Sequence, residues 1–175
     1  MKELGLQVTA QVAGEIDEQY PSELQREEIP LFLASLKANA FMKAITVPDD
    51  TVVVTADTVV WTDSRALGKP TCRKEAIEML EMLSGKMHRV YSGVCLATNS
   101  KQHVFYDESK VFFRKLSLDE ITFYIDRYHP YDKAGAYGIQ EWIGYVGIEK
   151  IEGSYHNIVG LPVQKLYCEL CGFLE

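Results

Sequence analysis

The sequence of 175 residues lacks the features that mark membrane, secreted and nucleic-acid-binding proteins. No apolar run approaches the roughly 20 residues that span a bilayer. The acidic N-terminal segment has no apolar stretch of the kind found in signal peptides. Runs of lysine and arginine are absent too, and a net charge of -7 repels nucleic acid from most of the surface. We therefore expect a cytoplasmic protein that binds neither membranes nor nucleic acid.

The spacing of the cysteines and histidines argues against a metal site. The chain has four cysteines, and only Cys168 and Cys171 have metal-like spacing. They lie in a helical pattern without a second pair nearby, so positions on a helix are favoured over metal ligation. Free thiols fit a reducing compartment. The four histidines show no helical metal spacing, and structural or exposed positions are favoured for them.

The hydrophobic pattern predicts one domain of mixed strands and helices, of the α/β or α+β class with a mixed sheet. Residues 51–62 are β-branched and apolar on both faces, which predicts a strand covered on two sides. Residues 14–28 are polar and predict a loop. Other strands are predicted over 5–12, 90–98, 104–115 and 148–151. Helices are predicted over 28–45, 72–83, 117–128 and from Pro162 onward, with a capping box at Ser117.

Asp57 is anomalous because it lies in the middle of the most apolar strand. A carboxylate there is costly unless a partner compensates it. One interpretation is an aspartate that accepts hydrogen bonds from backbone amides. The other is a metal ligand or general base at the edge of a cleft. The residues alone leave these two interpretations balanced.

Several other charged residues have both an ordinary and a functional interpretation. Lys69 lies in the turn Leu67-Gly68-Lys69-Pro70, where it is either solvated or presented to a phosphate. Lys37 borders the apolar stripe of the first helix, a typical place for a snorkelling lysine. The loop acids Asp17, Glu18 and Asp132 are ordinary surface charges when taken singly. Together with Asp57 they offer oxygen ligands for one Mg²⁺ ion.

In combination, five motifs resemble the Maf (septum-formation-inhibitor-like) family along nearly the whole chain. The nine-residue string DKAGAYGIQ is the most specific of them. The motifs lie at 56–60, 67–70, 82–88, 132–140 and 160–162.

The resemblance implies a mixed α/β fold with an elongated central sheet, flanking helices and a nucleotide cleft between two lobes. It implies a nucleoside triphosphate pyrophosphatase, which cleaves between the α and β phosphorus atoms to give a monophosphate and diphosphate. The AYGIQ form resembles the branch that acts on dTTP and UTP. A divalent metal is implied, Mg²⁺ with Mn²⁺ as the alternative, and a homodimer would be ordinary.

The resemblance also implies roles for individual residues. Asp57 matches the family's proton acceptor and is a candidate metal ligand. Lys69 and Lys37 match lysines that face the phosphates. Thr58, Gln140 and Lys133 are expected to bind the substrate. Either Asp17 or Glu18 matches an acidic pair that contributes to the metal site, and the sequence does not choose between them.

One departure from the family pattern concerns the start of the chain. Family members begin with a strand and a Ser-x-Ser-Pro-Arg-Arg loop. The first residues of this sequence, Met1 to Gly5, resemble the segment just after that loop. We expect residues 1–175 to form a single Maf-like domain that is N-terminally truncated relative to the family. The retained lysines and Asp57 favour an enzyme. The absent loop favours the alternative, a catalytically weak or inactive nucleotide-binding or regulatory protein of the same fold.

Overall fold

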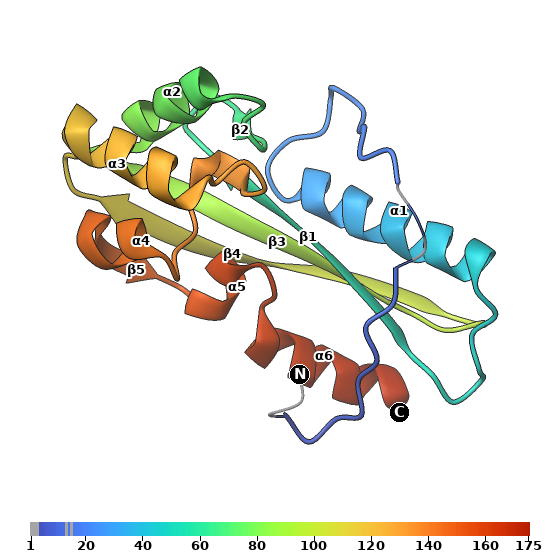
Figure 1. The fold of residues 1–175 in the computed structure, drawn as a ribbon. Coiled ribbons are helices and arrows are strands. Elements are labelled where there is room, and N and C mark those ends of the chain that lie inside the picture. Colours follow the sequence, from blue (N-terminus) through green and yellow to red (C-terminus); the bar gives the residue numbers. More distant parts are fainter. Residues whose placement is uncertain (1–3, 13, 15) are drawn as a thin grey trace.

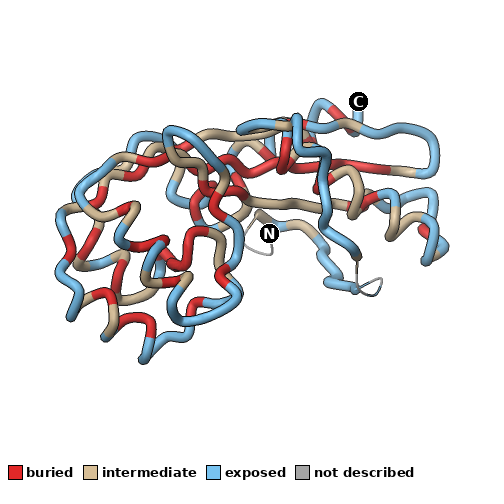
Figure 2. The backbone as a smooth tube through the Cα atoms, turned by 90° about the horizontal axis from the view of Figure 1, so that it is seen from above, coloured by how far each residue is buried: buried red, intermediate tan, exposed pale blue. Residues whose placement is uncertain are grey.

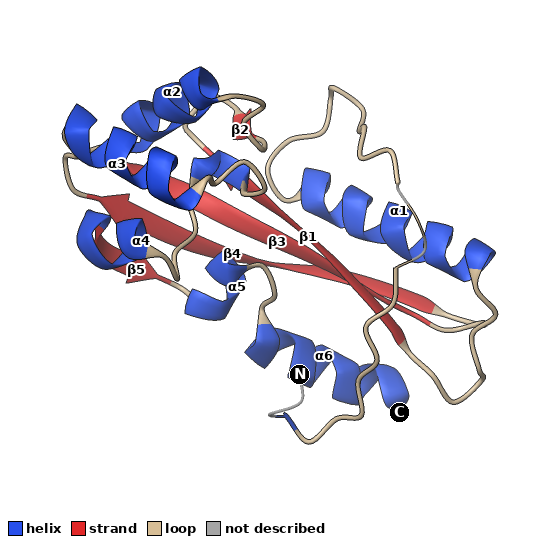
Figure 3. Ribbon diagram, in the orientation of Figure 1, coloured by secondary structure: helices blue, strands red, loops and turns tan. Residues whose placement is uncertain are grey.

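The computed structural model describes residues 4–12, 14 and 16–175. A central sheet runs the length of the molecule, with helices packed on it at both ends (Figures 1 and 3). None of the helices described combines the length and apolar character that crossing a bilayer requires. The elements follow in the order α1 (Glu28–Ala44), β1 (Val53–Trp61), β2 (Ala66–Leu67), α2 (Arg73–Leu83), β3 (Met87–Ala97), β4 (Gln102–Phe113), α3 (Leu118–Tyr128), the 3-10 helix η2 (Ala134–Ala136), α4 (Trp142–Gly147), β5 (Ile148–Glu152), α5 (Tyr155–Val159) and α6 (Val163–Leu174).

The sheet has the strand order β2-β1-β3-β4-β5. All four pairings are antiparallel, so the sheet is purely antiparallel and not the mixed sheet that the sequence predicted. A tight turn over residues 98–101 joins β3 and β4, because antiparallel neighbours need only a short connection. The expected class, a central sheet with flanking helices, is confirmed.

Helices α1 and α6 cover opposite faces of the sheet at one end (Figure 1). Successive side chains of a strand point to opposite faces. Accordingly, Cys95 and Ala97 of β3 pack with α1, whereas Val94 and Leu96 pack with α6. Strand β1 lies between the same helices, which confirms the prediction of a strand covered on two sides.

Helix α1 packs tightly on the sheet at Gly93 of β3. A Cβ atom built on Gly93 would lie 2.4 Å from the backbone carbonyl carbon of Pro30 in α1. Real Cβ atoms essentially never make so close a contact with backbone. Only glycine therefore lets α1 lie at this depth, and the depth of α1 determines where its later residues reach the sheet edge.

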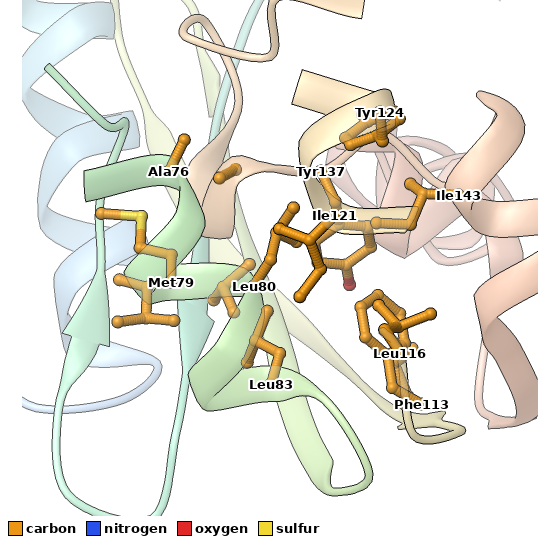
Figure 4. Packing of buried hydrophobic residues seen from close by; sticks show 14 of the residues in the cluster. Ala76, Met79, Leu80, Leu83, Phe113, Leu116, Ile121, Tyr124, Tyr137 and Ile143 are labelled. Carbon is orange, nitrogen blue, oxygen red and sulfur yellow. The ribbon is translucent and has the colours of Figure 1, made fainter. Parts of the chain in front are cut away.

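The other end of the molecule is a second lobe, built by α2, α3, η2 and α4. Its core contains Leu80 from α2, Ile121 from α3 and Tyr137 after η2 (Figure 4). Val90 of β3 belongs to the same core. Buried residues occur at both ends of the molecule (Figure 2), and strand β3 contributes Val90 to one core and Val94 to another. The lobes therefore share the sheet.

The sequence prediction was wrong for residues 5–12, which form no strand. Val8 is 39% exposed and Val12 is 88% exposed, so the alternating pattern buries little apolar surface. A strand also requires a ladder partner, which a pattern cannot provide. The short helices α4 and α5 were not predicted. The four longer predicted helices and the other four strands are confirmed, with small differences at their ends.

The capping box at the start of α3 is present as predicted. The Ser117 hydroxyl accepts a hydrogen bond from the Glu120 amide, and the Glu120 carboxylate accepts one from the Ser117 amide. Arg114 donates two further hydrogen bonds to Glu120, with Nη2 2.6 Å from Oε1. Hydrogen bonds from Arg114 and from the Ser117 amide lower the pKa of Glu120 to about 2. The start of α3 is thus fixed by three residues.

We expect Ser117→Ala to destabilise the protein by about 1 kcal/mol, the usual cost of a lost helix cap. For a protein of this size, that corresponds to a Tm lower by about 2–4 °C. A thermal melt measures it. Ser100→Ala, in the exposed turn between β3 and β4, serves as the control. If both variants melt together, the cap contributes nothing to stability.

Candidate active site

A cleft of about 370 Å³ lies where the two lobes meet. Five chain segments form its walls: the middle of β1, the turn after β2, β3 at Val90, the segment around η2 and the end of α5. Its lining comprises Ala56, Asp57, Thr58, Val60, Lys69, Val90, Asp132, Lys133, Ala134, Tyr137, Gly138, Ile139, Gln140, Glu141, Ile158, Val159 and Gly160. The volume falls in the range of small-molecule sites.

Asp57 lies in the cleft with its side chain 12% exposed. Its Oδ1 accepts a hydrogen bond from Nζ of Lys37 in α1, at 2.5 Å. Burial raises the pKa of the Asp57 carboxyl, and the Lys37 ammonium opposes this effect. The interpretation as an aspartate bonded only to backbone amides is therefore wrong, because its partner is a charged side chain.

Lys37 and Lys69 are joined by the carboxylate of Glu18. Oε1 of Glu18 lies 2.8 Å from Nζ of Lys37, and Oε2 lies 3.4 Å from Nζ of Lys69. The hydrogen bond from Lys37 lowers the pKa of Glu18. Burial lowers the pKa of Lys37, but its hydrogen bonds to Asp57 and Glu18 outweigh burial and raise it. Lys37 is thus not a snorkelling surface lysine.

The structure distinguishes between the two neighbouring acids of the early loop. Glu18 meets both lysines, whereas Asp17 is exposed and accepts a hydrogen bond from the Gln19 amide at 3.3 Å. Asp17 makes no ion pair among the residues that the structure describes. The grouping of Asp17 with the site residues is therefore not reproduced by this geometry.

Thr58 lines the cleft next to Asp57, and its hydroxyl contacts the neighbouring strand β3 and the residue that follows α5. Its hydroxyl lies 2.7 Å from that of Ser92 in β3, and it donates to the Gly160 carbonyl at 3.4 Å. The Ser92 hydroxyl also contacts the Asn157 carbonyl of α5, at 2.8 Å. These contacts hold the end of α5 against β1. Gln140 lines the opposite wall and is exposed.

The segment around η2 carries a second group of charges. Nζ of Lys133 lies 3.0 Å from Oδ2 of Asp132 and 3.4 Å from Oε1 of Glu141. The amide of Gly135 donates to the Gly68 carbonyl at 3.0 Å, next to Lys69 in the turn. This hydrogen bond joins the segment around η2 to the turn that carries Lys69, along one side of the cleft.

The cluster around Lys37 provides two oxygen ligands that suit a divalent metal. Within residues 4–12, 14 and 16–175, no three His, Cys, Asp or Glu side chains gather into an enclosing site. Glu18 and Asp57, however, both face the same ammonium. Mg²⁺ commonly takes one or two carboxylates and completes its shell with water and substrate phosphates. The residues present therefore fit a metal that binds together with a phosphate substrate.

Comparison with known proteins identifies the family of this chain. A family model described as Maf-like protein matches residues 1–173. The chain belongs to the Maf family. It is 52% identical to a dTTP/UTP pyrophosphatase of Bacteroides fragilis over 97% of this chain and 87% of that protein. Proteins with the same name from Parabacteroides distasonis and Porphyromonas gingivalis are 51% and 50% identical to this chain. The first match covers 97% of this chain and 87% of that protein, and the second covers 92% and 81%.

Four of the five motifs, all but the one at 82–88, contribute residues to one cleft in the structure. Asp57, Thr58, Lys69, Lys133 and Gln140 line it, and Lys37 and Glu18 contact its charged residues. Three other residues of its walls and supports were not predicted from the sequence: Glu141, Tyr124 and Ser92. Glu141 directly follows the DKAGAYGIQ string, which could have marked it. The hydroxyls of Tyr124 and Ser92 carry no comparable signal, because buried tyrosine and serine are common in cores.

Proposed function

We propose that this chain hydrolyses dTTP and UTP to the monophosphate and diphosphate. The observation that carries the proposal is the cluster of Asp57, Lys37, Glu18 and Lys69 at a nucleotide-sized cleft. The reaction needs a general base next to cations that neutralise phosphate charge. The three relatives named dTTP/UTP pyrophosphatase support the choice of substrates.

Asp57 is proposed as the general base. Its Oδ atoms would take a proton from the water that attacks the α phosphorus, while diphosphate leaves. Burial of the carboxyl supports this role, since the raised pKa makes Asp57 a stronger base than an exposed aspartate. Lys37 and Lys69 would contact the phosphates once Glu18 is no longer ion-paired with both lysines.

Asp57 and Glu18 are proposed to hold the metal, with Mg²⁺ as the ion and Mn²⁺ as the alternative. When bound, the metal supplies positive charge that offsets the charge of the transferring phosphates. Glu18 has a lowered pKa and is therefore ionised throughout the physiological range. This state is the one that a hard cation requires. Asp17, which the resemblance also suggested, is not included.

Thr58, Gln140 and Lys133 are proposed to bind the nucleotide away from the reacting phosphorus. An amide side chain such as that of Gln140 both donates and accepts hydrogen bonds. The imide edge that thymine and uracil share offers matching partners. The exposure of Gln140 at the cleft wall supports this role, because its amide is available to a ligand.

We expect dTTP and UTP to be hydrolysed faster than GTP, ATP or 7-methyl-GTP. The reason is that Gln140 matches the imide edge and purines lack that edge in the same place. Diphosphate release from a panel of triphosphates, with and without Mg²⁺, measures it. Preference for 7-methyl-GTP would contradict the substrate assignment but not the reaction. Binding of dTTP without release of diphosphate would favour the nucleotide-binding alternative.

A cytoplasmic location, a homodimer, the lack of nucleic-acid partners and the organisation as a single domain stay predictions from the sequence. Three of the free cysteines are exposed, which is compatible with a reducing compartment.

A further inference from the structure

Tyr124 of α3 is fully buried and packs in the core of the second lobe (Figure 4), yet its hydroxyl contacts residues of the cleft wall. The hydroxyl donates a hydrogen bond to Oε2 of Glu141. It also accepts one from the backbone amide of Gly138, at 3.0 Å. Both partners lie in the segment that lines the cleft. The hydroxyl is therefore attached to the site, whereas the ring belongs to the core of the lobe.

Glu141 also forms an ion pair with Lys133, so it links the Tyr124 hydroxyl to that lysine. Its second oxygen, Oε1, lies 3.4 Å from Nζ of Lys133. A Cβ atom built on Gly138 would lie 2.8 Å from Cε of Lys133 and 2.9 Å from Cδ of Glu141. Both side chains therefore lie directly over Gly138. The amide of Glu141 also donates to the Gly138 carbonyl at 3.0 Å, which closes the turn that carries Gln140.

We propose that Tyr124 is a positioning residue, which acts through Glu141 and Gly138 to fix Lys133 and Gln140 against the bound nucleotide. The inference rests on the proposed function and adds to it a residue outside the cleft. Tyr124 touches neither phosphate nor base. Its hydroxyl determines where the ammonium of Lys133 and the amide of Gln140 lie.

The positioning role can be separated from a role in the core. A phenylalanine ring would fill the same space beneath α3 and keep the stacking on Tyr128, whose ring centroid lies 5.2 Å away. Only the two hydrogen bonds to the cleft segment would be lost. Loss of ground-state contacts that persist in the transition state raises KM and leaves kcat unchanged.

We therefore expect Tyr124→Phe to raise KM for dTTP and UTP about five- to tenfold, with kcat changed less than about twofold. Glu141→Gln keeps an acceptor for Tyr124 but removes the charge next to Lys133, and it should raise KM similarly. The double variant should be no worse than the stronger single variant, because both changes break one chain of contacts. Tyr128→Phe, one turn later on α3, is the matched control and should leave KM unchanged.

Tyr124→Phe with wild-type KM would overturn the proposal, as would a loss confined to kcat or effects that multiply in the double variant. Thermal melts of all variants identify any loss that reflects unfolding.

Hydrogen exchange separates this proposal from the proposed function. Peptides that cover residues 133–141 should exchange faster in Tyr124→Phe than in Tyr128→Phe, because the Gly138 amide loses its acceptor. This measurement needs no turnover. If the wild-type chain releases no diphosphate, the proposed function fails. Faster exchange together with weaker dTTP binding by calorimetry would still support the positioning role, and unchanged exchange would end it.

Discussion

Replacing Asp57 with asparagine is expected to lower kcat for dTTP by about 100-fold or more, the scale of a lost general base. Asparagine has nearly the same shape and can still accept the hydrogen bond from Lys37. It cannot take a proton from water. The fold should survive, because the Asp57 carboxylate is already destabilised by burial and its replacement is neutral.

The measurement is steady-state release of diphosphate from dTTP, together with a thermal melt. Asp63→Asn is the matched control, since Asp63 is an exposed aspartate in the turn after the same strand. We expect it to behave as the wild type. An Asp57→Asn variant that turns over at a near-normal rate would remove Asp57 from the role of base.

Gly93→Ala is expected to cost about 1–3 kcal/mol of stability, the usual penalty for overpacking a core. A methyl group at Gly93 would collide with the backbone of Pro30, which cannot rotate away as a side chain could. Helix α1 must then shift, and it carries Lys37 to a different place beside Asp57. Because each kcal/mol lowers Tm by about 2–4 °C at this size, the change should be several degrees.

A thermal melt and the kcat/KM for dTTP together test the role of Gly93. Gly172→Ala is the matched control, because a Cβ atom on that glycine of α6 meets nothing within 4 Å. Alanine in a helix should leave stability unchanged or slightly improved. If Gly93→Ala melts with the wild type and keeps its activity, α1 is not held at the depth that the contact implies.

Patterns that report burial predicted most of the fold. The run at 51–62 is apolar on both faces, and β1 is covered by α1 and α6. Ser117 and Glu120 have capping-box spacing, and both hydrogen bonds are present. The same kind of pattern failed over residues 5–12, because alternation describes one strand and says nothing of a partner. Helices as short as α4 and α5 contain too few turns for a period to be visible.

The site was predictable only where a residue conflicted with its surroundings or belonged to a motif. Asp57 stood out because a carboxylate is rare in an apolar strand. The choice between Asp17 and Glu18 could not be made, because it depends on which side chain the loop turns toward Lys37. Tyr124 was invisible for a different reason. Its ring fits the apolar face of α3, and nothing in the sequence indicates where a buried hydroxyl points.

The shared sheet has a mechanical consequence. Strand β3 contributes Val90 to the core beneath α2 and α3, and Val94 to the core beneath α6. Two lobes that share continuous strands cannot rotate about a hinge without bending the strands and straining their ladders. The sheet should therefore resist bending between the lobes. We expect any adjustment to a bound nucleotide to occur in the loops that carry Glu18 and Lys133. We therefore expect the distance between the lobes to stay nearly constant when a nucleotide binds.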